Sequence, residues 1–306
     1  GYIVYSASKY KHWFFRVLDM ILKAYLYRKK YHYICIDVFS GRAFYWAYCI
    51  ARFATIFNKQ YILVLRGGNL PIFIDSNYKY FKIIANKAKH IIAPSQYLKE
   101  KTLKEFPISI IPNGIEEKYM FKLRKEAKPH LIWLRAFHHI YNPIMAIKVL
   151  KKLQKIYPNI NLTIIGPDKN DGSFLEVKKF IKENNLFDNV KMVGPIDKKI
   201  VPKYLSKSDI FLNTTNVDNN PVSVIEAMAS GLCIVSTNVG GIPYLLSHNL
   251  NSFLVNKNDI DGMTERVISI IQNPKIAKKL SQNAYNSSKK FSWQQIYPLW
   301  EKLFKS

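Results

Sequence analysis

The side chains best suited to chemistry gather in one short segment, residues 218–241, which reads DNNPVSVIEAMASGLCIVSTNVGG. It carries two carboxylates, Asp218 and Glu226, with seven residues between them. An Asn-Pro pair precedes the apolar run; asparagine is a good N-cap, and proline suits the first position of a helix. We therefore predict a helix over residues 221–229, with Asp218 in the loop before it and Glu226 one turn inside.

The start of this predicted helix can bind an anion. The backbone N–H groups near Val222 and Ser223 have no acceptors within the helix, and the helix dipole is positive at this end. The helix follows a predicted strand at residues 210–213, and a helix N-terminus at the carboxyl end of a strand is a phosphate site. Glu226 could then accept hydrogen bonds from hydroxyl groups of the same ligand. The alternative is a solvated glutamate, but its apolar neighbours indicate a buried carboxylate with a partner.

Strand-like and helix-like runs alternate along the chain. We predict strands at residues 33–39, 61–65, 90–93 and 108–111, and then at 130–134, 161–165, 190–193, 210–213 and 233–236. Helices are predicted at 42–57, 78–88, 95–104, 142–157, 174–184, 199–206, 221–229, 261–273, 274–290 and 293–304. This alternation indicates an α/β fold of parallel sheets with crossover helices.

A charged segment without a clear period, residues 116–129, separates the two series. We therefore predict two doubly wound domains, residues 1–125 and 126–290, followed by a last amphipathic helix within 291–306. In such folds ligands bind at the carboxyl ends of the strands, in a cleft between the domains.

Composition narrows the classes of function. The 306 residues include 46 Lys and Arg against 21 Asp and Glu, a formal charge of +25, and 48% are hydrophobic, which excludes simple disorder. Three widely separated cysteines without a CxxC pair argue against a disulfide scaffold or a cysteine zinc site. No apolar run approaches the ~20 residues that cross a bilayer. The charge suits nucleic acid, a phosphate ligand or a membrane face, or is simply a lysine-rich solvated surface.

Together these features resemble the GT4 family of retaining glycosyltransferases, which have the GT-B fold. The family signature is an acidic residue, seven residues and a glutamate in an EAMA-Gly helix, then a strand and a Gly-Gly loop, as in residues 218–241. Residues 111–115 resemble the interdomain segment, and residues 91–98 the start of the helix before it. Arg135 ends a strand where the family binds phosphate. The helix from Trp293 resembles the one that crosses back to the first domain.

The resemblance implies two Rossmann-like domains facing a cleft and an enzyme of the EC 2.4 class. Such an enzyme moves a sugar from a nucleotide-diphosphate donor, here a UDP- or GDP-sugar, to a glycan or lipid-linked acceptor with retention of configuration. It requires no metal, because arginine and the helix dipole stabilise the departing diphosphate. The resemblance also implies a cytoplasmic protein, peripheral at the inner face of the cell membrane and engaged in polysaccharide biosynthesis for the envelope.

The resemblance also assigns roles to single residues. Glu226 binds the ribose hydroxyls, Asp218 stands in place of the family's usual glutamate and faces the donor sugar, and Arg135 neutralises the diphosphate. Backbone groups complete the donor site, through N–H groups given to phosphate or a close approach allowed by glycine, at Val222, Ser223, Gly240 and Gly241.

Several positions depart from the family pattern. No lysine follows Arg135 before the next helix; His138 and His139 lie there, and a protonated histidine could supply the charge. Tyr244 replaces an acidic residue after the Gly-Gly loop. Arg66 holds the place of a histidine beside the reaction centre; it cannot act as a base but can stabilise the leaving phosphate, and the alternative is an arginine without a catalytic role. The opening GYIVYSAS resembles the family's second strand, so the first strand and its glycine-rich loop are not expected in this chain.

Two other functions stay open at this stage. A remnant that binds nucleotide without transferring sugar would fit the lack of that loop. A basic nucleic-acid-binding protein would explain the charge, although no nucleic-acid-binding signature is present and the predicted site holds an acidic pair.

The basic and aromatic segment 9–33 has two interpretations. Its apolar residues fit a helix packed on the sheet, with a stripe made of Trp13, Phe14, Val17, Leu18, Ile21, Leu22 and Tyr25. Its cations form a rim that could meet anionic lipid headgroups, made of Lys9, Lys11, Arg16, Lys23, Arg28, Lys29 and Lys30. Both hold if one face packs on the core and the other meets a membrane.

Overall fold

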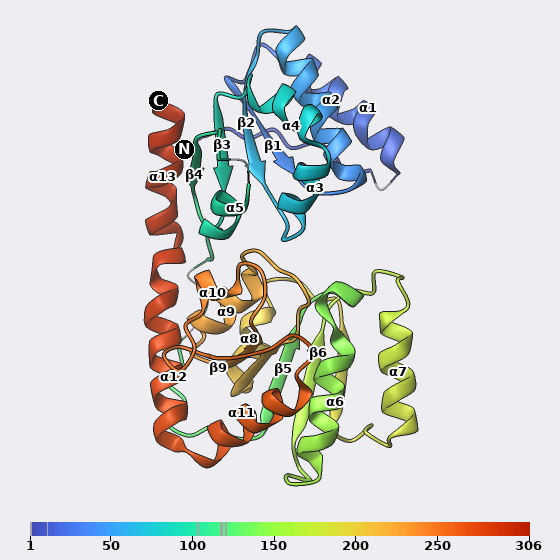
Figure 1. The fold of residues 1–306 in the computed structure, drawn as a ribbon, viewed down its shortest axis with the longest axis vertical. Helices are drawn as coiled ribbons and strands as arrows, with labels where there is room; N and C mark the ends of the chain where they lie inside the picture. Colours follow the sequence, from blue (N-terminus) through green and yellow to red (C-terminus); the bar gives the residue numbers. More distant parts are fainter. Residues whose placement is uncertain (1, 11, 103, 117–118, 120) are drawn as a thin grey trace. The chain divides into compact units, whose positions relative to one another are not determined.

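The computed structural model of the chain describes residues 2–10, 12–102, 104–116, 119 and 121–306. The chain divides into two compact units, Gly1–Ile111 and Pro112–Ser306. Each is built on a parallel sheet with helices packed against it (Figure 1). The boundary between the units lies between residues 111 and 112, before the charged segment 116–129. The sequence had predicted it within that segment, between residues 125 and 126.

The described residues between 112 and 125 fold with the second unit because a buried arginine, Arg124, ties them to it. The Arg124 guanidinium donates hydrogen bonds to the backbone oxygens of Leu205 at 3.0 Å and Ser208 at 2.7 Å. Its Nε lies 3.6 Å from Oδ1 of Asp209, which is also buried. A buried charge needs such partners, and they exist only in the second unit. A charged run in the sequence normally indicates solvated residues, so this arginine could not be told from its neighbours.

The first unit holds a four-stranded sheet in the order β1-β2-β3-β4, with every neighbouring pair parallel. Its strands are β1 (Tyr33–Val38), β2 (Gln60–Leu65), β3 (His90–Ala93) and β4 (Ile108–Ile110). Its helices are α1 (Trp13–Leu26), α2 (Arg42–Ile56), α3 (Leu70–Ser76), α4 (Tyr78–Ala85) and α5 (Gln96–Lys101). Helix α3 was not predicted. The helix predicted over 95–104 is shorter, and position 103 lies outside the described residues.

The start of the chain differs from the expectation. Residues 2–10 form no strand, although this segment resembles a family strand in sequence. Its apolar side chains Ile3 and Val4 are exposed, so nothing in the described chain pairs with or covers them.

The core of the first unit lies between β2 and α2. Strand β2 is apolar and buried from Tyr61 to Leu65, as expected for a strand of a parallel sheet that is covered on both faces. Helix α2 buries one face against it, made of Phe44, Ala47, Ile50, Ala51 and Ala54. These positions recur at helical spacing, so the predicted helix over 42–57 is confirmed.

The second unit holds a six-stranded parallel sheet in the order β10-β9-β8-β5-β6-β7. Its strands are β5 (His130–Leu134), β6 (Asn161–Ile165), β7 (Val190–Gly194), β8 (Ile210–Asn213), β9 (Cys233–Thr237) and β10 (Phe253–Val255). The chain leaves β5 toward β6 and β7, then returns to place β8 on the other side of β5. The strand order therefore reverses between β5 and β8, and in open α/β sheets ligands bind at such a reversal.

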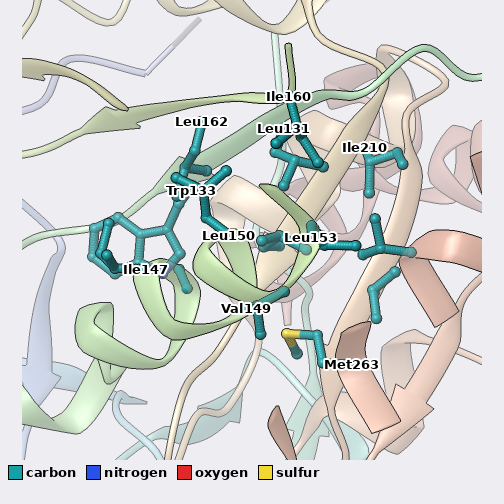
Figure 2. Packing of buried hydrophobic residues seen from close by; sticks show 14 of the residues in the cluster. Leu131, Trp133, Ile147, Val149, Leu150, Leu153, Ile160, Leu162, Ile210 and Met263 are labelled. Atoms are coloured by element: carbon teal, nitrogen blue, oxygen red, sulfur yellow. The ribbon is translucent and has the colours of Figure 1, made fainter. Parts of the chain in front are cut away.

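Helices cover both faces of this sheet. They are α6 (Pro143–Gln154), α7 (Ser173–Glu183), α8 (Val201–Lys207), α9 (Val222–Ala229), α10 (Ile242–Leu245), α11 (Ile260–Gln272), α12 (Pro274–Ser288) and α13 (Trp293–Lys305). Strand β10 and helix α10 were not predicted. Figure 2 shows the packing between α6 and the strands, in which Leu150 and Leu153 of α6 meet Leu131 and Trp133 of β5, all fully buried.

The segment that enters the second unit packs against the start of α13. Ile115 N donates to Phe291 O at 2.9 Å, and Ile115 forms a bridge with Ser292. A Cβ built on Gly114 would lie 2.9 Å from the Trp293 ring, so only glycine fits there. Two segments that the resemblance singled out therefore meet within the second unit. The return of the 291–306 helix to the first domain stays a prediction.

None of the helices among the described residues combines the length and the apolar character that crossing a membrane requires.

Candidate active site

The elements around the strand reversal bring the predicted site together. Arg135 follows β5, and the loop with Asp218 follows β8 and leads into α9. The N-cap of α9 is Pro221, one residue later than predicted, and the first helical residue is Val222. Pro221 keeps the φ of −69° that its ring imposes but has an extended ψ of 117°, so it caps the helix instead of starting it.

Arg135 and Asp218 form an ion pair between Nη2 and Oδ2, with side chains only 16% and 12% exposed. The Arg135 guanidinium also lies over the ring of Tyr141, 4.3 Å from its centre. Burial lowers the pKa of Arg135, whereas Tyr141 and the carboxylate of Glu226 raise it. The structure thus joins two residues that the sequence placed in one site, and makes each the other's partner.

Glu226 is buried in α9, as its apolar neighbours predicted, and it has a partner that the sequence did not predict. The hydroxyl of Tyr119 donates to Glu226 Oε1 at 2.5 Å. Burial, followed by the hydrogen bond to Glu226, raises the pKa of Tyr119, so this phenol stays protonated and acts as the donor. Tyr119 lies in the charged segment without a period, and no signal in the sequence distinguished it there.

The carboxyl edge of the sheet holds several buried polar atoms without a hydrogen-bond partner among the described residues. They are Arg135 Nε, Asn213 Oδ1 and Ser223 Oγ. Asn213 ends β8, and Ser223 is the second residue of α9. Leaving a buried donor or acceptor unsatisfied costs about 1–3 kcal/mol. Three such atoms around one strand reversal suit a site that a polar ligand completes.

The Gly-Gly pair supports the loop that carries Asp218. A Cβ on Gly241 would lie 1.8 Å from Asn219 O, and one on Gly240 would lie 2.2 Å from Asp218 O. Gly241 N also donates to Asp218 O at 2.9 Å. The close backbone approach that the sequence predicted is present, but it is made with the 218–219 loop. A contact with a donor at these glycines stays a prediction.

The two histidines after β5 organise a loop. His139 N donates to Asp171 Oδ2 at 2.6 Å, and His138 Nδ1 accepts from Ile140 N at 3.0 Å. Burial raises the pKa of Asp171, but hydrogen bonds from Ser173 and from the backbone of His139 outweigh this effect and lower the pKa to about 2. The Asp171 loop therefore holds the loop after β5 in place. Among the described residues, no group of histidine, cysteine and acidic side chains is arranged to hold a metal ion.

Arg66 lies in the first unit, directly after β2. Its Nε donates to Asp37 Oδ1 at 2.9 Å, and its backbone N donates to Val38 O at 2.8 Å. Both partners belong to β1, so this arginine lies at the carboxyl ends of two neighbouring strands. Its predicted role at a reaction centre stays a prediction.

Two parallel-sheet α/β units, with an arginine and a helix N-terminus at the strand reversal of the second, define a protein of the doubly wound α/β class. Comparison with known proteins gives the family. The model for glycosyl transferases group 1 matches residues 115–287, which is more than half of the chain. The chain belongs to this family, and the expected family resemblance is confirmed.

Curated relatives agree with this assignment. An uncharacterized glycosyltransferase of Methanocaldococcus jannaschii is 24% identical, over 77% of this chain and 65% of the relative. The UDP-Gal:alpha-D-GlcNAc-diphosphoundecaprenol alpha-1,3-galactosyltransferase of Escherichia coli is 24% identical, over 68% of this chain and 58% of the relative. The gpi3 subunit of phosphatidylinositol N-acetylglucosaminyltransferase from Schizosaccharomyces pombe is 22% identical, over 74% of this chain and 51% of the relative. The matches thus span between about half and two thirds of the relatives' length.

Solved structures show the fold. Anabaena HepE in complex with UDP and glucose aligns with a TM-score of 0.78 at 18% identity, over 94% of this chain and 81% of that one. Sucrose-phosphate synthase from Thermosynechococcus elongatus aligns with a TM-score of 0.76 at 18% identity, over 95% of this chain and 78% of that one. The predicted GT-B class, an α/β fold with two parallel-sheet domains, is confirmed.

Proposed function

We propose that this chain is a retaining glycosyltransferase of the EC 2.4 class. It moves a sugar from a UDP- or GDP-sugar to a hydroxyl of a glycan or lipid-linked acceptor. The observation that carries the proposal is the meeting of Arg135, the N-terminus of α9 and the buried Glu226 at one strand reversal. Family membership and the names of the relatives and of the solved complexes support the choice of a nucleotide sugar.

The diphosphate would lie between Arg135 and the start of α9. The N–H groups of Val222 and Ser223 face this end of the helix, and the Arg135 Nε has no protein acceptor among the described residues. Asp218 now neutralises Arg135, so a diphosphate has to replace that carboxylate as the partner of the guanidinium. Asp218, once released, is free to accept hydrogen bonds from the hydroxyls of the donor sugar.

The ribose would bind at Glu226. Its buried carboxylate accepts a hydrogen bond from one hydroxyl group, that of Tyr119. The ribose hydroxyls therefore take the place of this phenol or share the carboxylate with it. Gly240 and Gly241 fix the loop that limits the sugar side of the site.

The proposed transfer needs no separate general base. The bond from the sugar's anomeric carbon to the diphosphate oxygen breaks, and a bond to the acceptor oxygen forms on the same face. The leaving phosphate takes the acceptor's proton. Arg135 and the α9 dipole stabilise the charge that develops on this phosphate, with no metal in the scheme. Arg66 is the candidate for a second positive charge.

The proposed setting is the cytoplasm, peripheral to the inner face of the cell membrane, in polysaccharide biosynthesis. Two relatives carry names with lipid-borne acceptors, a diphosphoundecaprenol and a phosphatidylinositol. Nucleic acid is not proposed as a partner, because an acidic pair lies at the site.

The test is thermal stabilisation by UDP, GDP and their sugars in the absence of metal. Ligand at about 100 times its dissociation constant adds about 2.7 kcal/mol. Stabilisation by one nucleotide, lost in Glu226→Gln and kept in the exposed control Glu183→Gln, supports the donor site and identifies the base. No shift with any nucleotide contradicts it.

Binding alone does not separate an enzyme from a remnant. Release of sugar from the bound donor, to acceptor or to water, supports the enzyme. Tight nucleotide binding with neither transfer nor donor hydrolysis would favour the nucleotide-binding remnant instead. Salt-dependent binding of random DNA without nucleotide binding would favour the nucleic-acid alternative.

A further inference from the structure

Helix α1 turns an apolar face to solvent. None of its fourteen residues is buried. Only Met20 and Ile21 pack partly against the core of the first unit, where α1 lies beside α2 (Figure 1). Of the apolar stripe predicted to pack on the sheet, Ile21 contacts the core, whereas most of the other side chains are exposed.

The outward face carries no polar residue. Six large apolar side chains share it at helical spacing and are between 41 and 60% exposed: Phe14, Phe15, Leu18, Leu22, Tyr25 and Leu26. The ring of Tyr25 meets that of Phe57 at 5.7 Å, which extends the surface to the end of α2. The ion pair between Asp19 and Lys23, at 3.1 Å, lies on the half-buried side. Contiguous apolar surface of this kind marks a site of association.

The surroundings of this face are cationic. Asp19 is the single acidic residue among the first 36, against seven Lys and Arg. Arg28 stacks on Tyr25 with its guanidinium 3.9 Å from the ring centre, and Lys29 and Lys30 beside it are exposed. Lys11, one of the predicted rim residues, lies outside the described residues.

We propose that the outward face of α1 is a membrane-binding surface for anionic lipid. With fourteen residues the helix is about 21 Å long, shorter than a bilayer core of about 30 Å, so it lies in the plane of the interface. Its apolar side chains enter the acyl boundary, and Arg28, Lys29 and Lys30 meet the headgroups. A second copy of the chain would bring two net-positive segments together, whereas anionic lipid neutralises them. The inference rests on the proposed function, because the membrane surface gives that enzyme access to a lipid-linked acceptor.

The test is co-sedimentation of the whole chain with vesicles. We expect binding to mixed phosphatidylcholine and phosphatidylglycerol, weak binding to phosphatidylcholine alone, and a decrease with salt. The variant Phe14→Ser/Leu18→Ser/Leu22→Ser should bind at least about tenfold more weakly. The variant Arg28→Gln/Lys29→Gln/Lys30→Gln should lose the preference for phosphatidylglycerol. The control Leu175→Ser/Phe187→Ser, which removes apolar side chains of the second unit that are even more exposed, should bind like the wild type.

A depth measurement keeps the test independent of the serine variants. In Trp13→Phe/Leu18→Trp the new indole lies on the outward face of α1, so brominated acyl chains should quench its fluorescence beyond any quenching seen in Trp13→Phe alone. Equal vesicle binding by the triple serine variant overturns the proposal, as does an absence of quenching. A dimer in solution that the triple serine variant dissociates also overturns it, in favour of a second copy.

The outcome can be separated from that of the proposed function. Vesicle binding is measured without nucleotide, and nucleotide stabilisation without vesicles. Vesicle binding without nucleotide stabilisation supports the membrane surface and contradicts the donor site. The reverse result overturns the membrane surface alone.

Discussion

The hydroxyl of Tyr119 donates a hydrogen bond of 2.5 Å to Oε1 of Glu226, and both side chains are buried. One residue belongs to the segment that enters the second unit, and the other to the helix at its strand reversal. The carboxylate that we assign to the ribose is thus held by a phenol of the same chain. A change in this contact therefore affects both the segment that holds Tyr119 and the carboxylate of the proposed donor site.

Replacing Tyr119 with phenylalanine separates these two effects. We expect the free energy of unfolding to fall by about 1.5–3 kcal/mol, because a hydrogen bond to a buried charge is lost. Nucleotide affinity should rise severalfold, because Glu226 no longer exchanges a protein donor for a ribose hydroxyl. Denaturant unfolding and calorimetric titration measure the two quantities.

The control for this change is Tyr297→Phe, which removes an exposed hydroxyl from α13 and should alter neither quantity. Weaker nucleotide binding by Tyr119→Phe would show that Tyr119 orients Glu226 for the ligand instead of competing with it.

The ion pair of Arg135 and Asp218 predicts strong coupling between the two residues. Arg135→Met should cost about 3 kcal/mol of stability, because it leaves the Asp218 carboxylate with little solvent and no cation. Arg135→Met/Asp218→Asn should recover part of that loss. A double-mutant cycle of denaturant unfolding gives the coupling energy; additive losses would contradict the pairing.

The Gly-Gly loop predicts a steric effect that is distinct from backbone strain. Gly241 has an ordinary φ of −83°, but a Cβ there meets Asn219 O, so Gly241→Ala should cost about 3 kcal/mol and displace the 218–219 loop. Gly67 has a φ of 86° with open space around it, so Gly67→Ala should cost only about 1 kcal/mol. Thermal unfolding compares the two; a smaller loss for Gly241→Ala would argue against the contact.

Asp171 predicts a dependence of stability on pH. Its pKa is lowered from 3.8 to about 2 in the folded chain, so the unfolded state binds the proton more readily. The carboxylate therefore stabilises the fold above about pH 4, and this contribution is lost as the pH falls toward 2. Asp171→Asn should be less stable than the wild type near neutral pH and equal to it at about pH 2. A constant difference across urea unfolding curves at both pH values would exclude this cause.

Removal of divalent metal should leave nucleotide binding and transfer unchanged, because the charge on the diphosphate is assigned to Arg135 and the α9 dipole. The measurement is donor turnover with EDTA and after restoring Mg²⁺. Transfer that EDTA abolishes and Mg²⁺ restores would contradict this assignment.

The local structure around the site could be predicted from the sequence. The apolar runs of β5 and β8, the Asn-Pro start of α9 and the Ser-Gly stop after it are short-range signals, and they fixed these elements to within a residue or two. The burial of Glu226 followed from the apolar residues that flank it in the sequence. The same signals failed for short elements such as α3, α10 and β10, which are too short to show a period.

Only the tertiary structure decided which of these residues are partners. Arg135 and Asp218 lie far apart in the chain and pair because the sheet reverses its strand order between β5 and β8. Tyr119 and Arg124 lie in a run that reads as solvated charge, yet the fold buries both against the second unit. Periodicity reports which face of an element is apolar, but not what that face meets. For the same reason the sequence left open whether the apolar residues of α1 pack on the sheet or meet a membrane, and the structure turns most of them outward.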